Sequence, residues 1–336
     1  MARRDIIAIG GSAGSGTVLK KIVGGLPSDL RASLFISNHI PSNSPGYLAE
    51  VLASSSNLPV CQAVDGQPIE TGQIYVAVPD RHLLLIDGTI RLGEGPRENL
   101  ARPSIDPMFR SAALSYGSRS VGVVLTGMLN DGAAGLHAIK SVGGTAIVQH
   151  PIDAEADQMP LAALEAAQVD HVASAEDLAR VITEVATSEA GAELAHPEAL
   201  ALEVEIAAGA RLGSDTLRRI ADPSALTCPD CSGVLSEIRG QRPLRYRCQI
   251  GHTYTAEVLA SHLDEVDEAV RVAMRVMEER VTLVDRMAQD ARDTGRSAIA
   301  ELYDSRSVEY RRYAATLRDA AVLSVRMGGA SREQNI

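Results

Sequence analysis

Three short stretches of the sequence carry residues that are able to form a nucleophile, its general base and an orienting carboxylate. Ser12 lies in residues 10–14 (GGSAG), directly after a short apolar run. This stretch fits the pattern G-x-S-x-G, in which a sharp strand-to-helix turn holds a serine exposed above a sheet. The glycines favour such a turn because they tolerate unusual dihedral angles and a close approach of the backbone.

The same glycines also fit the phosphate loop of a short-chain dehydrogenase, which requires a tyrosine followed four residues later by lysine. None of the eight tyrosines has lysine at that offset. No acidic residue stands about 20 positions further on, at the end of a second strand, where it would bind a ribose. We therefore expect no nicotinamide, and no other cofactor for catalysis.

His39 and Asp131 follow two further apolar runs, residues 33–38 and 121–125. A single histidine is more often structural than catalytic, and an aspartate in this position also makes a good N-cap for the next helix. Both residues nevertheless stand at carboxyl ends of predicted parallel strands, where catalytic groups collect in open sheets. This placement makes them candidates for a Ser-His-Asp triad with Ser12, in which the hydrogen-bonding atoms would lie about 2.6–3.2 Å apart.

The elements that must position these residues form an α/β domain, which we place at residues 1–188. Apolar runs alternate with segments of helical period, and this pattern predicts a doubly wound, mostly parallel sheet. The expected strands are residues 6–9, 33–38, 74–78, 121–125 and 145–148, and the expected helices include 17–24 and 135–142. Within residues 82–96, an Asp-Gly pair between two alternating runs predicts a hairpin.

Five blocks in this domain resemble the catalytic domain of CheB-type protein-glutamate methylesterases. They are IAIGGSAG, HIP at 39–41, IYVAVPDRHL at 74–83, RPSIDPMFRSAA at 102–113 and VVLTGMLNDGAAGL at 123–136. The resemblance covers about residues 4–188 and implies that Ser12 is the nucleophile, His39 the general base and Asp131 its orienting carboxylate. It also implies that the backbone N–H of Met128 belongs to the oxyanion hole.

The resemblance implies hydrolysis of glutamate γ-methyl esters on the cytoplasmic helices of chemoreceptors, often with deamidation of glutamine. It makes a methyltransferase or a signalling kinase a further possible partner. Because the substrate lies on an acidic helix, we expect a shallow groove, and Arg97, Arg102 and Arg110 are candidates to face that helix. A solvated or structural role is at least as expected for each arginine.

The sequence departs from the family pattern in two ways. Chemotaxis methylesterases usually carry an N-terminal receiver domain, whereas this sequence starts at the catalytic strand, so we expect no control by such a domain. Ala13 stands where those enzymes commonly have threonine, and Ser15 where they have a second glycine. Neither change removes a triad group, but the loss of the hydroxyl beside the nucleophile is expected to affect positioning.

A second motif, Cys228-x2-Cys231-x16-Cys248-x3-His252, has the spacing of two zinc knuckles. We place a zinc-ribbon-like module at residues 225–257 and expect one structural zinc, with a reduced, metal-free turn structure as the alternative. Similar modules follow some CheB-type domains. Cys61 stands apart and is expected to be a small buried residue.

The remaining segments are a predicted linker at 189–224, a helical hairpin at 258–327 and a disordered tail at 328–336. In the first hairpin helix, apolar residues from Leu259 to Met287 recur mostly at steps of three and four, which puts them on one face. This face has two equally expected roles. The two helices pack on each other and on the ribbon, or the hairpin forms a dimer or partner interface.

The composition limits the classes of function. The formal net charge of −11 argues against binding to nucleic acid or to an anionic membrane surface. No apolar run approaches the ~18–20 residues of a membrane span, so we expect a cytoplasmic protein without membrane insertion. A non-catalytic adaptor that binds methylated receptors or a kinase is the alternative to the esterase, and the intact triad residues favour the enzyme.

Overall fold

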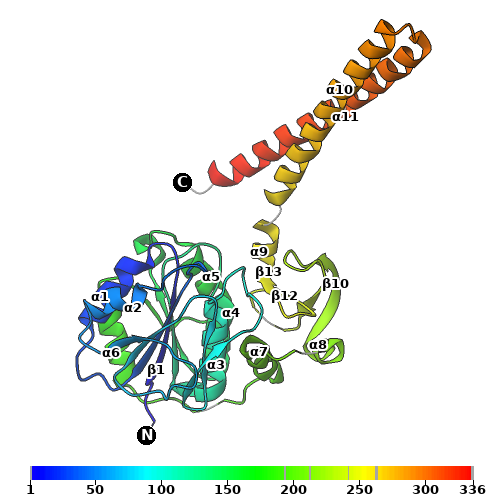
Figure 1. Cartoon of the computed structure of the whole chain (residues 1–336). Helices are drawn as coiled ribbons and strands as arrows, with labels where there is room; N and C mark the ends of the chain where they lie inside the picture. The colour runs from blue at the N-terminus through cyan, green and yellow to red at the C-terminus, as the bar shows by residue number, and fades with distance from the viewer. Residues whose placement is uncertain (1, 193, 212, 241, 262–263, 334–336) are drawn as a thin grey trace. The chain divides into compact units, whose positions relative to one another are not determined.

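The computed structural model describes residues 2–192, 194–211, 213–240, 242–261 and 264–333 (Figure 1). The chain divides into two compact units, Met1–Leu259 and Ala260–Ile336. The first unit contains every residue for which the sequence predicts chemistry.

The first unit is built on a seven-stranded parallel sheet with the strand order β3-β4-β2-β1-β7-β8-β9. The strands are β1 (Ile6–Gly11), β2 (Ser33–Asn38), β3 (Val60–Gln62), β4 (Ile74–Val76), β7 (Ser120–Val124), β8 (Thr145–Gln149) and β9 (His171–Ala173). The central strands β1, β2 and β7 are almost wholly buried, as expected for a parallel sheet covered on both faces. The predicted mostly parallel α/β fold is confirmed, and the predicted strand bounds differ by at most two residues.

Helices cover both faces of this sheet (Figure 1). One face packs against α1 (Ser15–Gly25), α2 (Leu48–Ala53) and α6 (Leu178–Thr187). The other packs against α3 (Ile105–Tyr116), α4 (Ala133–Ser141) and α5 (Gln158–Ala166). Strand side chains alternate between the two cores, so that Ile7 and Ile9 enter the first and Ala8 enters the second.

The predicted hairpin is formed by β5 (His82–Ile86) and β6 (Thr89–Gly93), which pair in antiparallel register. Both turn residues have positive φ, 46° at Asp87 and 81° at Gly88. This is the two-residue turn that an Asp-Gly pair favours.

The segment predicted as a linker, residues 189–224, contains regular structure and needs correction. It holds α7 (Glu198–Ala208), α8 (Ser214–Ile220) and the start of β10 (Ala221–Thr227). A four-stranded antiparallel ribbon then follows in the order β10-β11-β12-β13, with β11 (Val234–Ile238), β12 (Arg245–Cys248) and β13 (Thr253–Thr255). The Ala- and Glu-rich composition resembled a linker, but α7 buries Leu200, Val204 and Ile206.

A buried ion cluster joins α3, α7 and the ribbon. Glu98 accepts a hydrogen bond from Arg110 at 2.6 Å and from Arg247 at 3.3 Å. Glu203 of α7 contacts Arg245 at 2.9 Å and Arg247 at 3.0 Å. All five side chains are at most 1% exposed. Since isolated charges are very costly to bury, this cluster requires the three elements to stay together.

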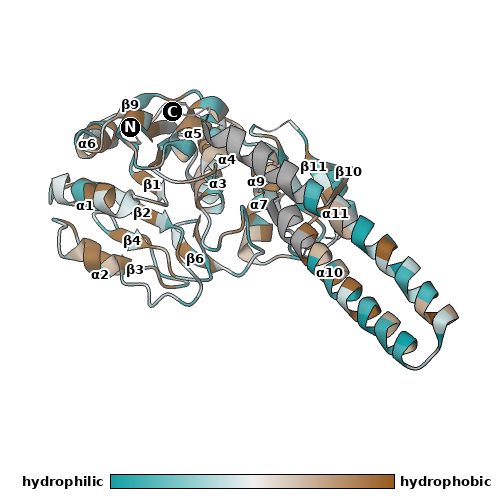
Figure 2. Cartoon of the chain, turned by 90° about the horizontal axis from the view of Figure 1, so that it is seen from above, coloured by the Kyte–Doolittle hydropathy of each residue, from teal (hydrophilic) through white to brown (hydrophobic). Residues whose placement is uncertain are grey.

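The second unit consists of two long helices, α10 (Asp264–Asp293) and α11 (Ser297–Glu333), which follow α9 (Ala256–Ser261) along the chain. Small residues, among them Ala288, Ala291 and Ala300, form the buried seam between them. Away from this seam, the coloured part of the pair carries many hydrophilic residues (Figure 2), and apolar residues such as Leu283 and Val308 are also exposed. Met287, one of the apolar residues predicted to share one helix face, is 37% exposed. The tail predicted to be disordered is helical over 328–333, while 334–336 lie outside the described residues.

Substitution of Glu203 tests whether the fold depends on the buried ion cluster. Burial opposes its charge, but Arg245, Arg110 and Arg247 outweigh burial and hold the pKa of Glu203 well below its usual range. We expect Glu203→Ala to lower the free energy of unfolding by about 3–5 kcal/mol, because it leaves buried arginines without their carboxylate. Urea unfolding measures this loss. Glu205→Ala, on the exposed side of the same helix, should change stability by less than about 0.5 kcal/mol, and equal losses would contradict the account.

Candidate active site and metal centre

Ser12 follows the last residue of β1 and is held in a tight turn before α1. Its backbone N–H donates to the carbonyl of Thr126 at 2.9 Å, which ties the turn to the chain after β7. Gly14 has φ 76° at the start of α1, where a side chain would be strained. A Cβ on Gly127 would lie 2.8 Å from the Cβ of Ser12. The two glycines allow the turn and the neighbouring strand end to meet closely around the serine.

The structure brings Ser12, His39 and Asp131 together. The Nδ1 atom of His39 lies 3.0 Å from the Oγ of Ser12, and Nε2 lies 2.7 Å from Oδ2 of Asp131. The strand order explains this meeting, because β1 lies between β2 and β7 and all three point the same way. Since the carboxylate only accepts, Nε2 carries the ring proton and Nδ1 is free to accept from the serine hydroxyl.

Asp131 is 2% exposed and accepts several hydrogen bonds besides that of His39. The N–H groups of Ile105 and Asp106 donate to it at 2.7 and 3.2 Å, and the hydroxyl of Ser104 donates at 2.8 Å. These donors form the N-terminal turn of α3, where a negative charge is stabilised by the helix dipole. Asn99 Nδ2 and the N–H of Gly132 complete the set at 3.1 and 3.0 Å.

A second buried carboxylate, Asp106, stands beside Asp131. Burial alone would raise the pKa of Asp131, but its hydrogen bond and charge interaction with His39 and the backbone donors lower it below the usual value. Burial and the charge of Asp131 raise the pKa of Asp106. Asp131 therefore carries the negative charge at neutral pH and holds His39 in the required tautomer.

The triad opens into a cavity of about 550 Å³. Its walls come from the segment after His39, from residues 97–102 and from the turn containing Met128 and Leu129. Gly127 and Leu129 donate their N–H groups to Ala156 and Gln158. Two amides near them are different. Among the residues that the structure describes, no acceptor pairs with the N–H of Met128, which lies between Gly127 and Leu129, or with the N–H of Ala13, which follows the serine. Both amides are thus available to an oxyanion.

The structure also separates the arginines that were grouped in the sequence analysis. Arg97 and Arg102 line the cavity, and Arg102 is held by Asp80 at 2.7 Å. Arg110 is 1% exposed in the ion cluster, so it does not face a substrate. Sequence reasoning missed Asn99 and Ser104 as partners of Asp131. Their stretch, 98–104, contains no strand or helix whose periodicity would have placed them.

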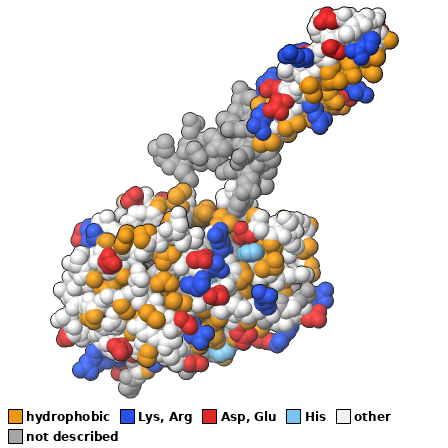
Figure 3. Space-filling view, in the orientation of Figure 1, with side chains coloured by type: hydrophobic (Ala, Val, Ile, Leu, Met, Phe, Trp, Pro, Cys, Tyr) orange, Lys and Arg blue, Asp and Glu red, His pale blue; other side chains and the backbone are white. Residues whose placement is uncertain are grey.

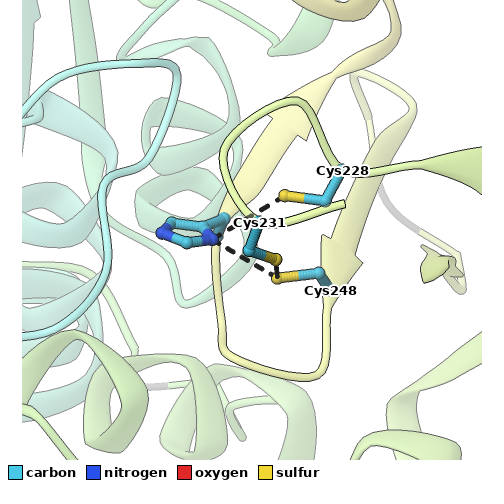
Figure 4. A group of neighbouring side chains, drawn as sticks. Cys228, Cys231 and Cys248 are labelled. Carbon is cyan, nitrogen blue, oxygen red and sulfur yellow. Dashed lines mark hydrogen bonds between the residues drawn. The ribbon is translucent and has the colours of Figure 1, made fainter. Parts of the chain in front are cut away.

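The cysteine and histidine side chains of the second motif also converge. The ligand atoms of Cys228, Cys231, Cys248 and His252 all lie within 4.8 Å of one another, and the three thiols point toward one another (Figure 4). The Sγ atoms of Cys231 and Cys248 are 3.7 Å apart, and Nδ1 of His252 is 3.6 Å from Sγ of Cys248. A tetrahedral zinc with Zn–S bonds of ~2.3 Å requires ligand separations of about this size. Cys61 lies elsewhere, half-buried in β3.

A parallel sheet covered on both faces, with a serine, a histidine and a carboxylate in line at its carboxyl edge, is an arrangement typical of serine hydrolases with an α/β fold. The family model for the CheB methylesterase matches residues 7–182. The chain belongs to the CheB methylesterase family.

Related proteins agree with this assignment. A protein of Leptospira interrogans named putative protein-glutamate methylesterase/protein-glutamine glutaminase is 40% identical over 178 residues, 53% of this chain and 92% of that protein. A protein-glutamate methylesterase/protein-glutamine glutaminase 2 of Anaeromyxobacter dehalogenans is 38% identical over 55% of this chain, which spans only 54% of that relative. The crystal structure of the Thermotoga maritima CheB methylesterase catalytic domain superposes with a TM-score of 0.52 at 32% identity, over 54% of this chain and 97% of that one.

The paired carboxylates predict a pH dependence of stability. The pKa of Asp106 is raised from 3.8 to about 7 in the folded chain, so its bound proton stabilises the fold below the ordinary pKa. That stability is lost as the pH rises toward 7. Between pH 5 and 7, we expect the unfolding free energy of the wild type to fall relative to that of Asp106→Asn by up to about 1.4 kcal/mol per pH unit. Denaturant titrations at several pH values measure this, and parallel curves would contradict it. Asp29→Asn, at an exposed position, is the control.

Proposed function

We propose that this chain is a protein-glutamate methylesterase, which hydrolyses glutamate γ-methyl esters on chemoreceptor-like proteins through an acyl-enzyme on Ser12. The observation that carries the proposal is the hydrogen-bonded line Ser12–His39–Asp131, with separations of 3.0 and 2.7 Å, at the edge of a cavity. The names of the two relatives, which include both methylesterase and glutaminase, support this substrate class and add glutamine deamidation.

In the first half of the reaction, Nδ1 of His39 accepts the hydroxyl proton as Oγ of Ser12 attacks the ester carbonyl. The N–H groups of Met128 and Ala13 donate to the oxygen that becomes negative. The tetrahedral intermediate collapses when the C–O bond breaks, and His39 returns the proton to the departing methoxide, which leaves as methanol.

In the second half, a water molecule attacks the acyl-enzyme and gives a proton to His39. Collapse of the second intermediate breaks the bond to Ser12, which regains its proton from His39. The product is an unesterified glutamate side chain on the substrate protein. Asp131 stays ionised throughout and stabilises the imidazolium that forms in each half. A methyl ester is a far more reactive acyl group than a peptide, so these few groups suffice.

The surroundings of the cavity fit a substrate on an acidic receptor helix. Arg97 is exposed at the cavity, and Arg102 lines it. The chain carries a net charge of −11, and on the face shown in Figure 3 charges of both signs are interspersed. Attraction of an acidic helix therefore depends on local arginines.

No helix among the described residues is long and apolar enough to cross a membrane. A methyltransferase or signalling kinase is a further proposed partner, and the site of action is proposed to be the cytoplasm.

We also propose a structural zinc held by Cys228, Cys231, Cys248 and Nδ1 of His252. Three of the separations between ligand atoms are 3.6–3.7 Å, and all lie within 4.8 Å, which supports the proposal. Three thiolates with one imidazole are a common set for a closed zinc site. With all four positions filled by protein, such an ion stabilises the ribbon and takes no part in hydrolysis.

The esterase proposal is tested by release of methanol from a methyl-labelled receptor. We expect Ser12→Ala to lower kcat by at least about 10³-fold, because the acyl-enzyme is lost while binding is kept. Ser54→Ala, at an exposed position just after α2, should retain full activity. If wild type and Ser12→Ala release methanol at the same background rate, the adaptor is the correct alternative.

Metal analysis of the purified chain tests the zinc proposal. We expect about one zinc per chain, and none in the double variant Cys228→Ser/Cys231→Ser, because two ligands do not hold the ion in place. Cys61→Ser serves as the cysteine control and should keep its metal. A metal-free wild type with the same melting temperature before and after chelation would reject the proposal.

A further inference from the structure

The loop that borders the catalytic cavity has an unusual backbone. Asn99 and Leu100 are consecutive residues with φ of 48° and 65°. A left-handed conformation is tolerable for asparagine and unfavourable for leucine, and such strain persists only where surrounding contacts impose it. Asn99 is buried, whereas Leu100 is 37% exposed at the cavity.

Two sets of contacts hold this conformation. The N–H groups of Glu98 and Ala101 each donate to the carbonyl of the other, at 3.2 and 3.0 Å, and close a two-residue turn around Asn99 and Leu100. The second set comes from the last strand of the ribbon. The N–H of Asn99 donates to the carbonyl of Thr253 at 2.8 Å, and the N–H of Thr255 donates to Oδ1 of Asn99 at 3.2 Å. Glu98 also forms a parallel bridge with Thr253. The loop thus extends the ribbon sheet by one short segment beyond β13.

The amide nitrogen of Asn99 reaches the catalytic carboxylate. Nδ2 donates one proton to Oδ1 of Asp131 and the other to Oδ2 of Asp106, both at 3.1 Å. An amide has two protons to give, so this group is fully used in bridging two carboxylates that repel each other. The arrangement also fixes the orientation of the amide, because its oxygen accepts from the ribbon.

A second link joins the ribbon to the turn that carries Asp131. The hydroxyl of Thr255 donates to Oδ1 of Asn130 at 2.8 Å, and Nδ2 of Asn130 donates to Glu257 at 2.7 Å. Thr255 is fully buried, and Asn130 is the immediate neighbour of Asp131. The same turn contains Met128, the proposed oxyanion donor. β13 therefore contacts the supports of both the carboxylate and the oxyanion hole.

We propose that Asn99 is a positioning residue of the hydrolytic reaction and that β13 is the part of the active site that holds it and the Asp131 turn in place. The ribbon then sets the rate of turnover at Ser12 without touching the substrate. This inference rests on the proposed esterase function. A purely structural ribbon would affect stability alone.

Asn99→Asp is the first test, because it keeps the shape and replaces the bridging donor by a third carboxylate. At pH 8 we expect kcat for methanol release to fall about 10²-fold with KM changed less than threefold. The ratio of variant to wild-type kcat should rise as the pH falls to 6, since the added carboxyl regains a proton and donates again. A ratio that is the same at every pH, or an unchanged kcat, overturns the proposal.

The ribbon side is tested by a matched pair at Thr255. Thr255→Val removes the hydroxyl at nearly constant volume and should lower kcat about tenfold, with KM within twofold of wild type. Thr255→Ser restores the hydroxyl and should restore kcat to within about threefold. Ser236→Ala in β11, two strands away from β13, is the ribbon control and should leave kcat unchanged. Equal kcat in Thr255→Val and wild type overturns the role of β13.

Labelling of Ser12 by a fluorophosphonate probe separates failure of this inference from failure of the proposed function. Labelling requires an activated serine but no methylated receptor. If the wild type is labelled but releases no methanol, the receptor substrate is wrong. In that case, the probe should still label the Asn99→Asp and Thr255→Val variants at least about tenfold more slowly than the wild type. If the wild type is neither labelled nor active, both proposals are wrong.

Discussion

Asp131 is the group on which the arrangement of the site depends. It takes the place of a capping side chain at the first turn of α3, where it accepts the N–H groups of Ile105 and Asp106, and with its other face it accepts from His39. A carboxylate supplied with so many donors keeps its charge although it is only 2% exposed. The first turn of α3 and the imidazole are therefore held by the same side chain, so that a shift of one displaces the carboxylate that holds the other.

The second constraint is the burial of charge between parts of the chain that are distant in sequence. Glu98 and Arg110 belong to the region that matches the CheB methylesterase family, whereas Glu203 and Arg247 lie beyond it. Such a cluster contributes little net stability compared with apolar packing, but losing one member is costly. The main effect of the cluster is therefore to specify which surfaces of α3, α7 and the ribbon meet. Its contribution to the strength of their contact is smaller. That specificity adds to the apolar packing of α7, which buries Leu200, Val204 and Ile206, in placing α7 and the ribbon on the α3 side of the domain.

Much of this arrangement was accessible from the sequence, because it follows from periodicity and strand ends. Ser12 and His39 directly follow β1 and β2, and Asp131 lies in the turn after β7, so the parallel order alone brings them to one edge. Asn99 was not accessible, since its role arises from a left-handed loop and from a partner, Thr255, that is 156 residues away. The α7 helix was missed for a related reason. Its buried glutamate looks like a surface residue until the arginines that neutralise it are in place.

The family match and the Thermotoga catalytic domain both correspond to about the first half of this chain, and the chemistry proposed for Ser12 needs only groups from that half. Their placement in this chain involves more. The oxygen of Asn99, the amide of Asn130 and the charge of Glu98 each have a partner in residues 247–257. Two of these partners, Arg247 and Thr255, are fully buried, whereas Glu257 is exposed. Hydrogen bonds and ion pairs depend on direction, so they fix the positions of the groups that they join more closely than apolar contacts do. The zinc that we propose at the cysteine and histidine cluster would support this arrangement, because His252 directly precedes β13, the strand that contacts the loop.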